Sequence, residues 1–309
     1  MLSRTADCLF WLGRYTERAA NVARGLSVGL RLAGLSAQLG AESDEWRSLL
    51  IATGCEPAFF ARHAEVSQEK VVDFLVRDPD NFSGIISCFA AARHNARSVR
   101  TALTVDMWGA LNDTWNTLRT AEFQGERLPG FLEWVRERVL LFNGAAQDTM
   151  LRGEPWLFVQ LGTMLERADN TARLIDVKHN LLTPGQRTTV EYGQWQAILQ
   201  SVSALRAYHW VYRDGIEPAK IAELLILRRE LPRSLVACHG RVLEVLDAIA
   251  DGQGGRRGEC HRMAGELHAR LRYGRIQDIL SAGLHEYLTD MIERTATLGA
   301  EIEAFYIRA

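Results

Sequence analysis

The chain contains one twenty-residue phrase twice, and this repeat limits how it can fold more than any other feature. The first copy, LFWLGRYTERAANVARGLSV, starts at Leu9, and the second, FVQLGTMLERADNTARLIDV, starts at Phe158. Nine of the twenty aligned residues are identical, which leaves the shared run L-G-x-x-x-E-R-A-x-N-x-A-R. Such self-similarity indicates a structural unit that occurs more than once.

Weaker similarities follow the phrase in the same order in both halves of the chain. The pairs are EWRSLL from Glu45 with QWQAIL from Gln194, FLVRDPDNFSGIISC from Phe74 with LLILRRELPRSLVAC from Leu224, and FLEWVRERV from Phe131 with LHEYLTDMI from Leu284. We therefore predict one domain over residues 1–309, built from internal repeats 1–153 and 154–309 that are related by an approximate twofold axis.

The whole chain has the pattern of helices rather than strands. Apolar residues recur at helical spacing, strand-like alternation is scarce, and there are only seven prolines. We predict an all-α multi-helix bundle, with helices over 3–35, 45–53, 68–76, 82–105, 129–151, 154–182, 190–212, 218–227, 232–250, 259–273 and 279–307. Pro129, Pro155, Pro218 and Pro232 stand where helices could begin.

On a helix, the repeated phrase places polar residues beside a wide apolar arc. Gly13, Glu17 and Arg24 lie along one edge of that arc, with Asn21 just beyond them. The second copy places Gly162, Glu166, Asn170 and Arg173 in the same way. Arg18 and Arg167 point elsewhere, because adjacent residues are not neighbours on a helix surface. A small residue at the position of Gly13 would let another helix or a ligand approach closely.

The first of these helices is apolar on nearly every side, so its charged side chains are expected to be surrounded by protein. Buried charges must be paired and hydrogen-bonded. The favoured interpretation is a structural network in which Glu17 pairs with an arginine of the second repeat and Glu166 with one of the first. A second interpretation is a cleft that binds an anionic or amide-bearing ligand. A third makes Glu17 or Glu166 a catalytic acid or base.

Several functional classes find no support in the composition or motifs. The net charge of −2 carries no long run of one sign, so we expect neither a nucleic-acid partner nor a membrane surface. The N-terminal apolar patch is too short for a signal peptide or a membrane span. Five scattered cysteines without C-x-x-C indicate reduced thiols and a cytoplasmic protein. The sequence carries no signal for an oligomeric state.

No metal or cofactor is expected from the motifs. There is no Glu-x-x-His pair for a di-iron site, no Walker A loop, no G-x-G-x-x-G and no G-x-S-x-G. His261 and His268 share a helix face with Cys260 nearby, but this is a weak zinc pattern. We interpret both histidines as surface or interface residues.

The chain resembles the bacterial alpha-E family from end to end. The resemblance is carried by MLSRTADCLFWLGRYTERAANVAR, FVQLGTMLERADNTARLIDVKHNLL and YGQWQAILQSVSALRAYHWVYR followed by LPRSLVAC. It implies an all-helical domain whose Glu-Arg motif is here Glu17-Arg18 and Glu166-Arg167. It also implies a protein encoded beside, or fused to, a circularly permuted ATP-grasp protein, often near a transglutaminase-like protease.

ATP-grasp enzymes join a carboxylate to an amine through an acyl phosphate, so this association implies peptide synthesis or modification. We expect a non-catalytic accessory or binding subunit that contacts an ATP-grasp ligase, its peptide substrate, or both. The alternative is an enzyme acting on the amide product, with Glu17 or Glu166 as acid or base and arginines holding a carboxylate. Arg14 of the first copy is Thr163 in the second, so the two copies need not be equivalent.

Overall fold

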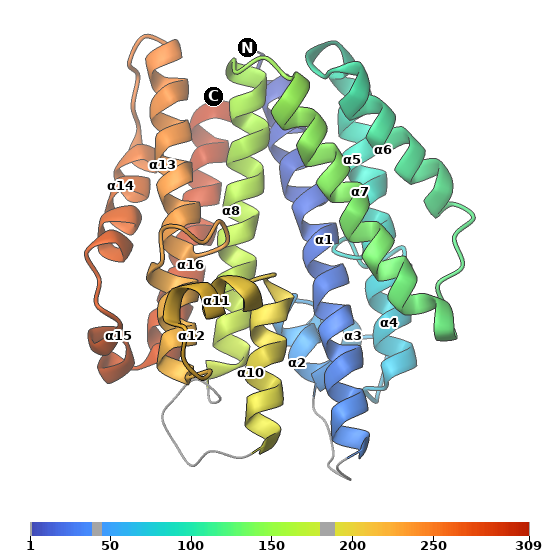
Figure 1. Ribbon diagram of the computed structural model, residues 1–309. Coiled ribbons are helices and arrows are strands. Elements are labelled where there is room, and N and C mark those ends of the chain that lie inside the picture. Colours follow the sequence, from blue (N-terminus) through green and yellow to red (C-terminus); the bar gives the residue numbers. More distant parts are fainter. Residues whose placement is uncertain (1, 39–44, 180–188, 309) are drawn as a thin grey trace.

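All secondary structure in the described part of the chain is helical. The computed structural model describes residues 2–38, 45–179 and 189–308 (Figure 1), and the all-α prediction is confirmed. The α-helices are α1 (Ser3–Gln38), α2 (Glu45–Ala52), α3 (Glu56–Phe60), α4 (Gln68–Val76), α5 (Ile85–Ser98), α6 (Val105–Leu118), α7 (Leu128–Thr149), α8 (Glu154–Val177), α10 (Thr189–Ser201), α11 (Leu205–Tyr212), α12 (Pro218–Leu227), α13 (Leu235–Gly252), α14 (Glu259–Arg272), α15 (Ile276–Ala282) and α16 (Leu284–Ile302). Short turns Arg100–Ala102 (η1) and Gly125–Arg127 (η2) are 3₁₀, and Glu303–Ile307 (η3) is π-helical.

The two long helices that carry the repeated phrase, α1 and α8, lie side by side in the centre of the bundle (Figure 1). Their glycines allow this close approach. A Cβ atom on Gly13 would collide with the backbone oxygen of Val159, and one on Gly162 would collide with that of Phe10. Both glycines belong to the shared run, so the phrase contains the residues that set the distance between its own two copies.

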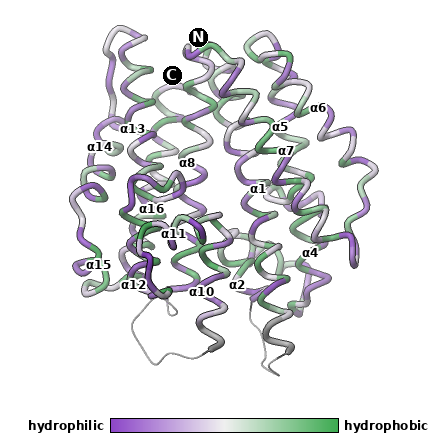
Figure 2. The backbone as a smooth tube through the Cα atoms, in the orientation of Figure 1, coloured by the Kyte–Doolittle hydropathy of each residue, from purple (hydrophilic) through white to green (hydrophobic). Residues whose placement is uncertain are grey.

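The other helices cover this central pair. Helices α5, α7 and α10 pack on α1, whereas α13 and α16 pack on α8. Figure 2 shows hydrophobic residues recurring along α8 and hydrophilic residues along the outer helix α14. This distribution is the one expected when amphipathic helices turn their apolar faces towards a shared core.

The apolar interior is divided into two clusters, and α1 contributes to both. Residues of α1 up to Leu12 pack into the larger cluster, which contains most of the second half of the chain. From Ala19 onward, α1 packs into a smaller cluster with α2, α4, α5 and α7. The segment between them, residues 13–18, contains Arg14, Glu17 and Arg18. The polar part of the phrase therefore occupies the boundary between the two apolar clusters.

Three of the predicted helices are interrupted in the structure. The predicted helix 82–105 is α5 followed by a 3₁₀ turn. A separate helix, α6, then begins at Val105, where Thr104 caps it by accepting a hydrogen bond from the Met107 N–H, and this helix was not predicted. The predicted helix 190–212 breaks into α10 and α11 at Ser203, which has φ of 58°. The predicted helix 279–307 breaks at Gly283, with φ of 106°, into α15 and α16.

The remaining differences concern helix ends. The predicted helix 232–250 starts later, at Leu235, because the Ser234 side chain caps it. Helix α8 ends at Val177, and the end predicted at Leu182 lies outside the described residues. The short helix α3 was not predicted.

No helix in residues 2–38, 45–179 and 189–308 combines the length and the apolar composition needed to cross a membrane. All five cysteines are free thiols with buried side chains. Burial raises the pKa of Cys88 to about 12 and that of Cys238 to about 11. These thiols are therefore protonated at neutral pH and poor nucleophiles.

Candidate functional site

Glu17 on α1 is almost completely buried and accepts hydrogen bonds from two arginines of the second half of the chain. Arg167 on α8 donates through Nη2 at 2.9 Å and through Nε at 3.2 Å. Arg233, just before α13, donates through Nη1 at 2.7 Å. The carboxylate thus has two cationic partners, neither of them on its own helix.

Glu166 on α8 has the reverse arrangement, because both of its arginines come from α1. Arg18 donates through Nε at 2.6 Å and through Nη2 at 2.9 Å, and Arg14 donates through Nε at 2.8 Å. Each Glu-Arg pair of the phrase therefore contributes its glutamate to one network and its arginine to the other. This is the reciprocal pairing between α1 and α8 that the structural interpretation required.

The main asymmetry of the site is the origin of the second arginine: Arg14 of the Glu166 network lies on α1 beside Arg18, whereas Arg233 of the Glu17 network lies just before α13 and not on α8. Where α1 has Arg14, α8 has Thr163, whose hydroxyl bonds to the Val159 backbone oxygen at 2.8 Å. Where the second half has Arg233, the aligned residue of the first half is Ser83. Arg233 fills the space beside Glu17, whereas the short Ser83 leaves space open beside Glu166.

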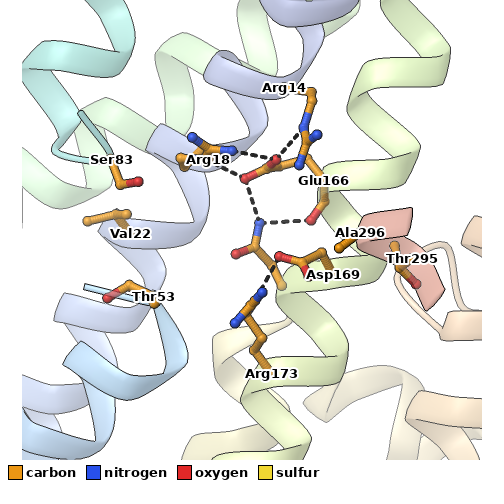
Figure 3. A pocket seen from close by; sticks show the side chains of 12 residues that line it. Arg14, Arg18, Val22, Thr53, Ser83, Glu166, Asp169, Arg173, Thr295 and Ala296 are labelled. Carbon is orange, nitrogen blue, oxygen red and sulfur yellow. Dashed lines mark hydrogen bonds and ion pairs between the residues drawn. The ribbon is translucent and has the colours of Figure 1, made fainter. Parts of the chain in front are cut away.

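That open space is a cavity of about 270 Å³ between α1 and α8 (Figure 3). Its lining includes three arginines, Arg14, Arg18 and Arg173, together with the carboxylates of Glu166 and Asp169. Arg173 donates to Asp169 at 2.8 Å. The cavity therefore offers guanidinium groups for an anion and carboxylates for a cation within one space that is open to solvent.

The asparagines of the two copies have different surroundings. Asn170 donates through Nδ2 to the Glu166 backbone oxygen at 2.8 Å, and its side chain lines the cavity. Asn21 accepts a long hydrogen bond of 3.4 Å from Arg233, but its buried Nδ2 has no hydrogen-bond partner in the described part of the chain.

The last arginines of the two copies also differ. Arg173 is half-buried and paired with Asp169. Arg24 is 7% exposed, and its Nε and Nη1 atoms are buried without a hydrogen-bond partner among the described residues. The sequence placed Arg24 on the same edge as Glu17, but the structure does not bring the two into a hydrogen bond.

The charge states of the two glutamates follow from their partners. Burial alone would raise the pKa of Glu166, but Arg18 and Arg14 outweigh it and lower the pKa to about 2. In the same way, Arg167 and Arg233 outweigh burial and hold the pKa of Glu17 well below its ordinary range. Both carboxylates are ionised at neutral pH, so neither is suited to proton transfer there. The one carboxyl of the cavity with a raised pKa is Asp169, and burial is the cause.

The histidines differ from their predicted surface role. His261 is buried, and its Nε2 lies 3.0 Å from the Tyr306 hydroxyl. His268 is partly buried beside Gly240. Of the predicted surface or interface role, the surface position is wrong for His261, because the C-terminal π-helical turn covers it.

One possible metal-binding group was not visible in the sequence. Asp176, His179 and His285 place three ligand atoms within 4.8 Å of one another. His285 bonds to the Asp176 carboxylate at 2.6 Å, and its ring stacks on that of His179. Imidazole and carboxylate ligands suit divalent transition metals. The sequence gives no signal for this group because His285 comes from α16, far along the chain from the end of α8.

The chain is similar to several curated proteins and to one protein family. The curated relatives include uncharacterized proteins from one strain of Mycobacterium bovis and two strains of Mycobacterium tuberculosis, each 24% identical to this chain over 319 residues. These matches cover 94% of this chain but only 35% of each relative, so the chain spans about a third of their length. No solved structure matches the chain. A family profile described as a predicted alpha-helical domain with a conserved ER motif matches residues 1–307. The chain, with its two cross-paired Glu-Arg motifs, therefore belongs to the Alpha-E family.

Proposed function

We propose that this protein is a non-catalytic accessory subunit of a cytoplasmic ATP-grasp amide or peptide ligase system. In this proposal the cavity of about 270 Å³ beside Glu166 binds the peptide substrate or product of the ligase. The observation that carries the proposal is the combination of guanidinium and carboxylate groups in one cavity between α1 and α8.

The chemistry of the cavity fits a ligand that carries both a carboxylate and an amine. Arginine binds carboxylates with two parallel hydrogen bonds. Arg173 is the best placed to do so, because within residues 2–38, 45–179 and 189–308 its one hydrogen-bond partner is Asp169 and its side chain is 32% exposed. Asp169 could then accept hydrogen bonds from a ligand ammonium group. A peptide end or an amino acid offers both groups.

A binding role agrees better than a catalytic one with the state of the two glutamates. Each is held by two arginines, and the low pKa of Glu166 makes it a weak base. The same contacts stabilise the bundle, so the structural and ligand-binding interpretations are compatible. Glu17 and Glu166 fix α1 against α8, and the space left by Ser83 accepts the ligand.

We also propose that residues 1–153 and 154–309 are related by an approximate twofold axis. The cross-pairing of the Glu-Arg motifs supports it, as do the reciprocal collisions that a Cβ would make at Gly13 and Gly162. One copy has then specialised. Arg233 closes the site at Glu17, and the site at Glu166 stays open.

The length of the relatives supports a role beside another protein or domain. The chain matches 35% of each relative's length, so in those proteins the homologous region stands beside a large additional sequence. A ligase and a transglutaminase-like protein would act on the same peptide.

An exposed apolar surface offers a contact for the ligase. Leu2, Val105 and Leu151 are 78%, 86% and 87% exposed. The N-terminus and the turns before α6 and α8 lie at one end of the bundle (Figure 1), and the Thr149 hydroxyl bonds to that of Thr104 at 2.7 Å. With a net charge of −2, association must depend on buried area rather than on electrostatic steering.

The test mixes the protein with the purified ATP-grasp ligase at micromolar concentration and follows co-elution and peptide-dependent ADP release. We expect a complex, and ADP release that depends on this protein. Arg173→Met should preserve co-elution and abolish the stimulation. Arg294→Met is the matched control, because Arg294 also pairs with an aspartate four residues earlier on a helix but lies outside the cavity. Independent elution with and without nucleotide would refute the proposal.

The alternative function is an enzyme acting on the amide product, and one observation favours a specific form of it. Asp169, not Glu17 or Glu166, has the raised pKa that a proton-transfer group requires. Turnover by the isolated protein that is lost in Asp169→Asn would establish this alternative.

A further inference from the structure

A second cavity, of about 560 Å³, is lined by four arginines and lies apart from the one beside Glu166. It lies between α1, α7, α10 and the start of α11 and is open to solvent, with the side chains of Arg31 and Arg206 exposed. Its cationic residues are Arg24, Arg31, Arg136 and Arg206, and no aspartate or glutamate of the part of the chain that the structure describes lines it. The space is within the range of small-ligand sites.

No carboxylate of the described residues forms an ion pair with an arginine of this cavity, and the charge of Glu17 acts on Arg24 without a hydrogen bond between them. Among residues 2–38, 45–179 and 189–308, none of the four arginines has an ion pair. The one hydrogen bond that their side chains make within these residues is from Arg31 to the neutral amide oxygen of Gln200. The buried Nε of Arg136 also has no hydrogen-bond partner in this part of the chain. Burying a cation without a partner is costly, and proteins avoid it unless something else binds there.

Arg24 is the most deeply buried of these four arginines. It is 7% exposed, and its Nε and Nη1 atoms have no hydrogen-bond partner among the described residues. Burial, with the like charge of Arg233 and Arg136, lowers the pKa of Arg24 to about 9. That value is still above neutral pH, so the guanidinium stays charged and its charge is held at a cost in stability.

The backbone adds donors to the same place. Ser203, in the left-handed conformation with φ of 58°, turns the chain from α10 into α11. Helix α11 starts with Ala204 as its N-cap, and no side chain caps it. The first N–H groups of a helix lack intrahelical partners, and they favour anions. Ser203, Leu205 and Arg206 at this helix start all line the cavity.

We infer that the cavity formed by Arg24, Arg31, Arg136 and Arg206 is a binding site for a di- or triphosphate group. Four guanidinium groups without a carboxylate match a ligand that carries several negative charges in a small volume. Arginine recognises phosphate oxygens with its planar, two-pronged geometry. A single carboxylate would neutralise only one of the four charges. The inference stands on this cavity alone and does not require the ligase partner.

The experiment measures thermal unfolding and calorimetric binding of the full chain at constant ionic strength. The probes are pyrophosphate, tripolyphosphate, inorganic phosphate and citrate. We expect saturable stabilisation by pyrophosphate or tripolyphosphate, with a rise in Tm of about 4 °C at a ligand concentration of about 100 times Kd. Inorganic phosphate and citrate should bind at least tenfold more weakly. ATP without magnesium is a further probe. If the protein binds ATP as tightly as tripolyphosphate, the phosphate chain is the ligand; if it binds ATP tenfold more tightly, the ligand is a nucleotide.

Two variants and one control make the result specific. Arg24→Met keeps the aliphatic volume and removes the orphaned charge, so it should melt at or above the wild type without ligand and lose the response to pyrophosphate. Arg206→Met changes an exposed side chain that cannot be needed for folding, and it should weaken binding about tenfold. Arg138→Met, two residues from Arg136 but outside the cavity, should respond as the wild type does. The inference is overturned if no phosphate stabilises the wild type, if citrate equals pyrophosphate, or if Arg206→Met keeps full affinity.

Discussion

Replacing each buried glutamate by glutamine should reveal how differently the two networks tolerate the loss of a charge. In Glu17→Gln, the guanidinium groups of Arg167 and Arg233 lose their shared carboxylate, with the unpartnered Arg24 also nearby. In Glu166→Gln, Arg14 and Arg18 lose theirs, but both border the cavity of about 270 Å³ and are slightly more exposed. We therefore expect Glu17→Gln to be the more destabilising change.

The magnitude can be derived from the pKa and from burial. A fall in the pKa of Glu166 from its ordinary 4.5 to about 2 corresponds to about 3 kcal/mol at about 1.4 kcal/mol per pKa unit. Breaking a fully buried pair typically costs ~3–5 kcal/mol, and Glu17, at 1% exposure, belongs at the upper end. With an unfolding entropy of about 2.1 cal/mol/K per residue, Tm should fall by about 5 °C for Glu166→Gln and by about 8 °C for Glu17→Gln.

Circular dichroism melts and urea titrations at pH 7 measure both changes. Glu259→Gln is the control, because Glu259 also bonds to an arginine but is exposed, and it should leave Tm unchanged. If Glu17→Gln stays within 0.5 kcal/mol of the wild type, or if Glu166→Gln loses more than Glu17→Gln, the account of the two networks is wrong.

Three further perturbations test other parts of the structure. Gly162→Ala places a Cβ against the Phe10 backbone oxygen and should cost at least about 2 kcal/mol in a urea titration, whereas Gly265→Ala, where a Cβ meets open space on α14, should stabilise by up to about 1 kcal/mol. Burial lowers the pKa of His239 to about 4 from its ordinary 6.5. Between these two pH values the unfolded chain binds a proton at this histidine and the folded chain does not. This should remove about 3 kcal/mol of stability between pH 6.5 and 4, and His239→Gln should show a smaller loss; identical pH profiles would contradict the assignment. Leu151→Asp should leave Tm unchanged and weaken co-elution with the ligase, and unchanged co-elution would exclude this end of the bundle as the contact.

Local patterns in the sequence predicted the helical class and the location of the site. Helical spacing of apolar residues is a property of neighbouring positions, and it correctly identified α1, α4, α7, α8 and α12 as helices. The repeat drew attention to Glu17 and Glu166, because a buried charge cannot be kept without a partner and must therefore be part of a network. Helix breaks were harder to predict. Ser203 adopts a left-handed conformation that glycine usually provides, so the end of α10 gave no visible signal.

The tertiary structure alone decided which partners the charged residues have. Arg233 bonds to Glu17, whereas its aligned counterpart Ser83 is too short to fill the cavity beside Glu166. Of the two aligned arginines, Arg24 has buried nitrogens without a partner among the described residues, and Arg173 is paired with Asp169. Helix periodicity fixes the face on which a residue lies, but not the distance to a side chain on another helix. That distance depends on how all the helices pack, and a change of about an ångström in it decides whether an ion pair forms. The sequence therefore determined the helices and the need for a polar network, and the packing of α1 against α8 and their neighbours determined which charges are satisfied and which remain available to a ligand.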